Sequence, residues 1–174
     1  SERIFSYGHH KITSIVPIGK LLENGSYGYT VDQGLNKDEV NYLRPGNFGY
    51  DPNSNGSYAA NADMTNKTKY PDAIDPVWTS VDKSIGVNGA VYVHPEKWQA
   101  WQNKLIVTAS ASSESRIIEF DEKGAFKSEK TIMKDKYGKL TELFEAPDGT
   151  IYGITDKGNP DRIIQLKVVC TVCG

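Results

Sequence analysis

The chain has 174 residues and a formal net charge of −2, so we expect one domain with a real core and no electrostatic attraction to nucleic acid. Lys and Arg are scattered rather than clustered, and no apolar run reaches the length of a membrane span. The apolar fraction of 38%, with 10 Tyr, 16 Gly and 8 Pro, favours short strands joined by turns, which predicts an all-β protein.

The first 50 residues contain three short β-type runs, at residues 3–7, 13–18 and 27–31, and then the run 40–43. A charged turn at 36–39 precedes the last run, and the glycine- and aromatic-rich stretch 44–50 after it predicts a tight corner against packed rings. Residues 51–73 are polar and rich in turn residues, so we expect a loop excursion at about 51–73 on one face of the fold.

The β-type pattern resumes at Gly89 and continues to the C-terminal region. Four strands are predicted at 90–94, 105–109, 116–121 and 127–133, with a short helical turn around Trp98 and Trp101. Two further runs flank the turn Pro147-Asp148-Gly149, and a last run at 162–169 follows a second turn. Strand, tight turn, strand, loop, strand is the rhythm of one blade of a β-propeller.

The number of blades limits what the chain can form by itself. At about 40–50 residues per repeat, the chain holds about three blades in a single partial β-propeller domain over residues 1–174. Closed propellers have about four to eight blades, and three blades leave two open sheet edges that invite pairing. We therefore expect another copy or another chain to complete the propeller, unless a lost or cleaved upstream half does so.

The tail at 170–174 carries Cys170 and Cys173 as a CxxC pair. Such a pair can be a redox dithiol, half of a zinc site or a small local disulfide. A zinc site needs a second pair of ligands, and the histidines of the chain are His9, His10 and His94. We interpret the pair as structural or incidental, with redox or metal chemistry as the alternative.

Four segments of the chain, taken in order, carry a resemblance to a known family. They are Ile4–His9, Asp38–Gly49, Tyr92–Ile118 and the terminal stretch from Ala146 to Leu166. Their order and spacing resemble the C-terminal half of the soluble quinoprotein glucose dehydrogenases and the related aldose or sorbosone dehydrogenases. The resemblance covers nearly the whole chain. It implies a six-bladed propeller that oxidises sugars with pyrroloquinoline quinone (PQQ) and calcium.

The resemblance also shows where this chain departs from the cofactor site of the family. His10 and Lys11 stand where the family has Arg and Asn, and Lys139 and Thr141 stand where it has two Arg. The stretch 110–113 has no cation where the family has Lys. PQQ carries three carboxylates, which Arg and Lys bind at about 1.5–3 kcal/mol for each charge-assisted bond. Because most of these cations are replaced, PQQ binding is doubtful, and His10 and Lys139 remain as candidate contacts.

A tryptophan and a calcium site follow from the same resemblance. Trp78 matches a Trp that packs on the quinone, although a buried blade residue would look the same. The family calcium is held partly by two backbone carbonyls, matched by Gly34 and Leu35, and by an Asp, matched by Asp38 one residue closer. A solvated acidic loop is the alternative. Nothing here matches the catalytic histidine of the family, so we assign no catalytic residue.

Three Asn-x-Ser/Thr sequons, at Asn24, Asn55 and Asn66, predict glycosylation sites. Together with the few cysteines they favour an extracellular or periplasmic protein. We expect a non-catalytic module used for assembly or for binding carbohydrate or another ligand. The alternative is the C-terminal portion of a PQQ- and calcium-dependent sugar dehydrogenase that oxidises aldoses. A CxxC redox protein is a third interpretation.

Overall fold

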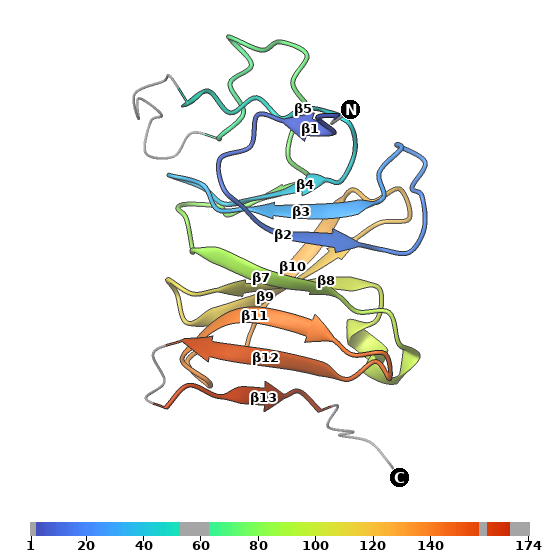
Figure 1. The fold of residues 1–174 in the computed structure, drawn as a ribbon, viewed down its shortest axis with the longest axis vertical. Coiled ribbons are helices and arrows are strands. Elements are labelled where there is room, and N and C mark those ends of the chain that lie inside the picture. Colours follow the sequence, from blue (N-terminus) through green and yellow to red (C-terminus); the bar gives the residue numbers. More distant parts are fainter. Residues whose placement is uncertain (1–2, 53–62, 157–159, 168–174) are drawn as a thin grey trace.

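The computed structural model describes residues 3–52, 63–156 and 160–167, which form three antiparallel sheets and one small parallel pair (Figure 1). The first sheet has the order β2 (Ile12–Pro17), β3 (Gly28–Asp32), β4 (Glu39–Tyr42) and β6 (Trp78–Thr79). The second has the order β7 (Val87–Tyr92), β8 (Lys104–Ala109), β9 (Glu114–Phe120) and β10 (Phe126–Ile132). The third has the order β11 (Lys139–Glu145), β12 (Ile151–Asp156) and β13 (Ile163–Gln165).

The first strand of each sheet lies on a shared inner side of the molecule. Strand β7 packs between β2 and β11, and all three run in the same direction (Figure 1). Each sheet then continues outward to a strand at its far edge. Radial sheets that share an inner row of strands are the arrangement of propeller blades. The prediction of an all-β arc of about three blades is confirmed.

Two apolar cores hold the three sheets together. The first lies between the first and second sheets, and its largest fully buried members include Tyr29, Val31 and Leu105. The second lies between the second and third sheets and includes Trp98, Ile106 and Ile151. Consecutive residues Leu105 and Ile106 thus enter different cores, because successive side chains of a strand point to opposite faces.

The two outermost faces of the arc differ in chemistry. The face of the first sheet that points away from the second sheet is polar but buried. It carries Thr30, Asp32, Glu39 and Asn41, each at most 2% exposed. The parallel pair β1 (Ser6–Tyr7) and β5 (Gly46–Asn47) lies over this side of the first sheet (Figure 1). The corresponding face of the third sheet is exposed and largely apolar, with Glu142 and Gln165 beside its apolar side chains. The chain therefore covers one end of the arc and leaves the other open.

Several elements differ from the sequence expectations in extent. The run at 3–7 is a strand only at Ser6–Tyr7, and within the described residues 162–167 the last run is a strand at Ile163–Gln165. The helical turn is the 3₁₀ helix η2 (Glu96–Trp101). In the excursion at 51–73, Met64 and Ala73 are buried, so the described part of it packs on the fold. Residues 53–62 of it, and the CxxC tail, lie outside the described residues.

Candidate functional site

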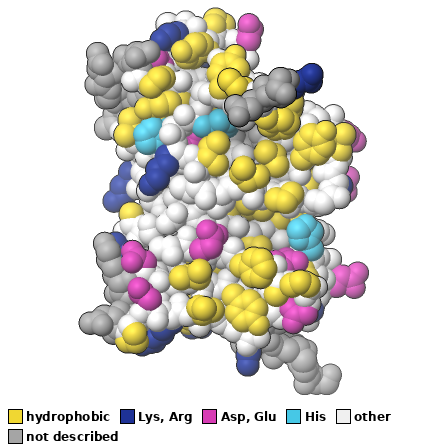
Figure 2. Space-filling model, in the orientation of Figure 1, with side chains coloured by type: hydrophobic (Ala, Val, Ile, Leu, Met, Phe, Trp, Pro, Cys, Tyr) yellow, Lys and Arg dark blue, Asp and Glu magenta, His cyan; other side chains and the backbone are white. Residues whose placement is uncertain are grey.

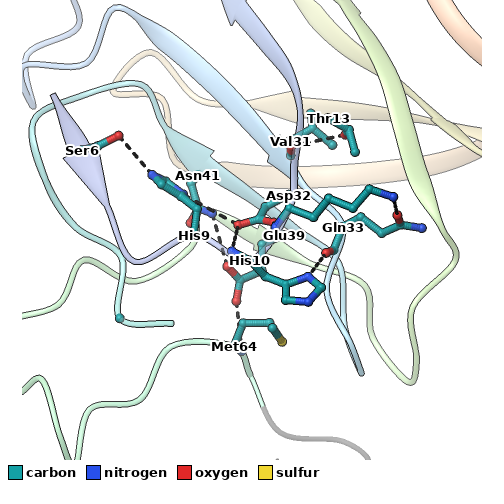
Figure 3. Close-up of polar contacts among 12 residues, drawn as sticks. Ser6, His9, His10, Thr13, Val31, Asp32, Gln33, Glu39, Asn41 and Met64 are labelled. Atoms are coloured by element: carbon teal, nitrogen blue, oxygen red, sulfur yellow. Dashed lines mark hydrogen bonds and ion pairs between the residues drawn. The ribbon is translucent and has the colours of Figure 1, made fainter. Parts of the chain in front are cut away.

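Polar side chains gather at the corner where the chain enters β2 and leaves β3. Asp32, at the end of β3, holds the segment that leads into β2. Its Oδ2 accepts the backbone N–H of His10 at 2.9 Å, and its Oδ1 accepts that of Lys11 at 2.5 Å. The imidazole Nδ1 of His10 lies 2.5 Å from the carbonyl oxygen of Gln33, and Lys11 Nζ donates to Gln33 Oε1 at 2.7 Å. Figure 3 shows Asp32, His10 and Gln33 turned toward one another. The ring of His10 also meets the edge of Tyr50, with centroids 4.9 Å apart.

A buried acid lies behind this corner. Glu39 Oε1 accepts the backbone N–H of Met64 at 3.0 Å, and its Oε2 accepts Asn41 Nδ2 at 3.2 Å (Figure 3). Burial, which is the largest cause, and the nearby charge of Asp32 raise the pKa of Glu39, the two hydrogen bonds lower it in part, and the net pKa is about 7. In the folded chain this buried carboxyl therefore titrates near neutral pH, above the usual range of a glutamate.

His9 packs in the same layer. Its ring stacks on Phe48, with centroids 4.6 Å apart and planes 26° apart. Its Nε2 lies 3.1 Å from Ser6 Oγ, and its Nδ1 lies 3.7 Å from Asp32 Oδ2. Gly8 makes the preceding turn at φ +76°, where a Cβ would lie 2.3 Å from Asn47 Oδ1. The turn is therefore restricted to glycine, and it directs His9 onto the sheet.

Asp38, a predicted calcium ligand, is fully buried, and both of its carboxylate oxygens accept hydrogen bonds. Its Oδ1 accepts Ser84 Oγ at 2.7 Å and the backbone N–H of Gly34 at 3.2 Å. Its Oδ2 accepts the N–H groups of Ile85 at 2.6 Å, Gly86 at 3.0 Å and Val87 at 3.4 Å. In this arrangement Asp38 ties the loop before β4 to the loop before β7.

The predicted calcium site consists of Gly34, Leu35 and Asp38, and calcium takes about six to eight oxygens, with carboxylates among them. Gly34 and Leu35 lie beside Asp38, but its carboxylate has no oxygen left for a metal. Within residues 3–52, 63–156 and 160–167, no group of three or more His, Cys, Asp or Glu side chains is placed to hold a metal. The calcium site stays a prediction.

The predicted cofactor contacts lie on different elements. His10 precedes β2 and Lys139 begins β11, so both stand at the start of an inner strand, with β7 between those strands. Trp78 lies on the outer strand β6, where it is 5% exposed and belongs to the core between the first two sheets. Its indole Nε1 donates to Glu129 Oε2 at 3.0 Å beside a groove of about 380 Å³. The structure thus separates Trp78 from the other two.

The three carboxylates of PQQ require a convergent set of cations. Among the three inner strands, only β11 carries a cation, Lys139. Lys11 stands before β2 and already donates to Gln33. The described residues therefore do not by themselves fit PQQ.

A second groove, of about 540 Å³, runs along the inner strands. It is lined by residues of β2, by the end of β7 with His94, and by residues 142–145 of β11. Ile15 and Phe144 are 64% and 60% exposed there. The polar wall includes Glu145, whose Oε2 lies 3.6 Å from His94 Nδ1 and accepts the backbone N–H of His94 at 3.3 Å. The groove combines an apolar surface with hydrogen-bonding groups.

Two of the three sequons lie within the described residues. Asn24 and Asn66 are half-buried, and the side-chain oxygen of each accepts a backbone N–H, from Ser26 and Lys69 respectively, at 3.0 Å. Asn55, Cys170 and Cys173 lie outside the described residues. Glycosylation stays a prediction. No helix in the described part of the chain has the length and apolar character to cross a bilayer.

Sequence reasoning missed Ser6, Asp32, Glu39 and Asn41 as members of a polar layer. A signal was present, because polar residues alternate with apolar ones along β3 and β4 (Thr30 and Asp32, then Glu39 and Asn41). Alternation of this kind normally marks a solvent-facing side. Here the polar side is covered by β1 and β5, which no periodicity in the strands reveals.

Blade-like sheets around a shared inner row define the chain as a partial propeller. The family model for glucose/sorbosone dehydrogenase matches residues 1–165, and the chain belongs to this family. A search of curated proteins gave no match.

Solved structures agree with this fold. A glucose dehydrogenase crystal structure superposes with a TM-score of 0.73 at 21% identity, over 95% of this chain and 47% of that one. The PQQ-bound aldose sugar dehydrogenase of Streptomyces coelicolor gives 0.62 at 18% identity, over 93% and 44%. The apo-form aldose sugar dehydrogenase of Escherichia coli gives 0.63 at 19% identity, over 89% and 44%. The chain therefore spans less than half the length of these structures.

Proposed function

We propose that this chain is a propeller module that does not oxidise sugars by itself, that associates with further blades through its third sheet, and that binds carbohydrate along its inner strands. The single observation that carries the proposal is the exposed apolar face of the third sheet. Phe144 pairs with Tyr152, and Ile154 pairs with Ile163, so these four side chains share one face. Phe144, Ile154 and Ile163 are 60%, 46% and 76% exposed.

Like the sheet faces that pack against one another within the chain, this face carries apolar side chains. Figure 2 shows hydrophobic side chains gathered in its lower half, over β11 and β12. Fully burying an Ile or Phe side chain contributes about 1.5–3 kcal/mol, so covering three of them supports a stable contact. The structural relatives are about twice as long as the part that this chain matches. We therefore infer that the occupant is another propeller blade.

The inner groove supports carbohydrate as the ligand class. A sugar ring presents C–H groups that pack on apolar side chains and hydroxyls that need donors and acceptors. The groove offers Ile15 for the first, and Tyr92, His94 and Glu145 for the second. An extracellular or periplasmic location is part of this proposal and rests on the sequons.

Association is tested by native mass spectrometry and light scattering. We expect the chain to exceed its monomer mass of 19.3 kDa, and the double variant Phe144→Lys/Ile163→Lys to return to that mass. Val81→Lys is the matched control, because Val81 is 69% exposed but lies in the loop after β6. It should not change the mass. A strict monomer for the unmodified chain, or equal effects of both sets of variants, contradicts the proposal.

A sugar dehydrogenase that includes this chain as one portion is the second candidate. Membership in the family favours it, as does the position of His10 and Lys139 at the starts of inner strands. Reconstitution of the longest natural form of the protein with PQQ and calcium, followed by dye reduction with aldoses, tests it. Aldose-dependent reduction would favour this candidate, and its absence would favour the module. Melting with calcium or with a chelator tests the calcium site separately.

A further inference from the structure

Ser6, His9 and Asp32 lie in series on the covered side of the first sheet. Ser6 Oγ is 3.1 Å from His9 Nε2, and His9 Nδ1 is 3.7 Å from Asp32 Oδ2. Figure 3 shows the His9 ring between the hydroxyl and the carboxylate. Hydroxyl, imidazole, carboxylate is the order in which a base activates a serine nucleophile while an acid orients the base.

The surroundings of the His9 ring favour the required tautomer. Its Nδ1 is buried and, among the described residues, has no hydrogen-bond partner, while its Nε2 faces Ser6. With the ring proton on Nδ1, Nε2 accepts the Ser6 hydroxyl proton and the Nδ1–H group points toward Asp32. The carboxylate then stabilises the imidazolium that forms when the base takes up a proton.

The base and the acid are held firmly, whereas the nucleophile is reachable. The side chains of His9 and Asp32 are 8% and 3% exposed, and the Asp32 carboxylate is fixed by two backbone N–H groups. Ser6 is only half-buried. Next to it, Ile4 and Phe5 are 84% and 46% exposed, so an apolar group that approaches Ser6 meets apolar surface.

We propose that Ser6 is a nucleophilic serine that takes the acyl group of esters with short apolar acyl chains. As the bond from Ser6 Oγ to the carbonyl carbon forms, His9 takes the hydroxyl proton. It passes this proton to the leaving alcohol oxygen as the ester C–O bond breaks. Water then attacks the acyl-serine with the same proton path, which releases the carboxylic acid and restores Ser6. This activity is independent of blade association and of sugar binding.

Labelling with a fluorophosphonate probe, followed by peptide mass spectrometry, tests the nucleophile. We expect the label on Ser6 and not on Ser128, an exposed serine that contacts the Glu119 carboxylate instead of a histidine. Ser6→Ala should abolish this label and reduce hydrolysis of p-nitrophenyl butyrate to the buffer rate, while Ser128→Ala should change neither. An unlabelled Ser6, or equal labelling of Ser128, overturns the proposal.

Variants of the other two residues separate catalysis from structure. His9→Ala should slow labelling of Ser6 at least about tenfold, since general bases contribute about 10²–10⁴-fold, and added imidazole should restore the rate. His9→Gln, which keeps a planar group against Phe48, serves if His9→Ala does not fold. Asp32→Asn should lower the maximal labelling rate and leave the half-saturating probe concentration unchanged. If the His9 variants do not slow the labelling of Ser6, or if imidazole does not restore the rate, the hydrogen bond between Ser6 and His9 is only structural and the proposal is overturned.

Discussion

Replacing the buried acid of the polar layer should change how stability depends on pH. The pKa of Glu39 rises from 4.5 to about 7 on folding. A carboxyl with a raised pKa stabilises the fold fully below its unfolded pKa, and this contribution is lost as pH rises through the folded pKa. Between about pH 4.5 and pH 7 the unfolded chain is ionised at this position while the folded chain keeps the proton. At about 1.4 kcal/mol for each tenfold change in proton affinity, the loss is about 3 kcal/mol.

The variant Glu39→Gln removes the titrating group and keeps its shape. Its amide oxygen can accept the Met64 N–H, and its NH₂ group can donate to Asn41 Oδ1, which has no partner among the described residues. We expect urea denaturation, followed by circular dichroism at pH 5 to 8, to show a flatter profile than the unmodified chain, with a difference of about 2.5 kcal/mol over this range.

Glu119→Gln is the matched control. Hydrogen bonds from Lys104 and then Lys127 lower the pKa of Glu119 to about 2, so its contribution is lost only as pH falls below the range tested. Its profile should run parallel to that of the unmodified chain. A Glu39→Gln profile that also runs parallel would refute the reasoning.

Three further substitutions test other contacts by chemical denaturation. Asp38→Asn should lower the free energy of unfolding by at least about 3 kcal/mol, because it disrupts a buried carboxylate with five donors. Asp82→Asn should lower it little, because Asp82 is exposed. Trp78→Phe should cost about 1–3 kcal/mol through the lost bond to Glu129 and the space it leaves, and an unchanged midpoint would contradict this. Gly8→Ala should lower the free energy of unfolding more than Gly25→Ala does. Both glycines have positive φ, but only at Gly8 would a Cβ meet neighbouring atoms. Equal losses of stability would count against a steric restriction at Gly8.

Much of the fold could be predicted from the sequence. Alternating apolar residues and turn residues predicted most strands, because both signals are local. The edge strand β6 was missed because Trp78–Thr79 is too short to show alternation. Strand β5 was predicted only as a corner, since Gly46–Asn47 pairs with Ser6–Tyr7 across almost forty residues of chain.

The site was harder to predict because its contacts are distant in sequence. The family resemblance implied Asp38 as a calcium ligand. Besides the Gly34 N–H, its partners in the structure are the Ser84 hydroxyl and the N–H groups of residues 85–87, which no local pattern connects to it. The layer of Asp32 and Glu39 was overlooked for a similar reason, since the elements that bury it come from other parts of the chain.

The shared second sheet has a consequence for how the molecule unfolds. Leu105 and Val107 belong to one core and Ile106 to the other, so a single strand, β8, anchors both. Opening either core exposes one side of this strand and weakens the support of the opposite side. The three sheets should therefore unfold in one cooperative transition rather than one sheet at a time. Amide hydrogens along β8 should be the last to exchange with deuterated solvent.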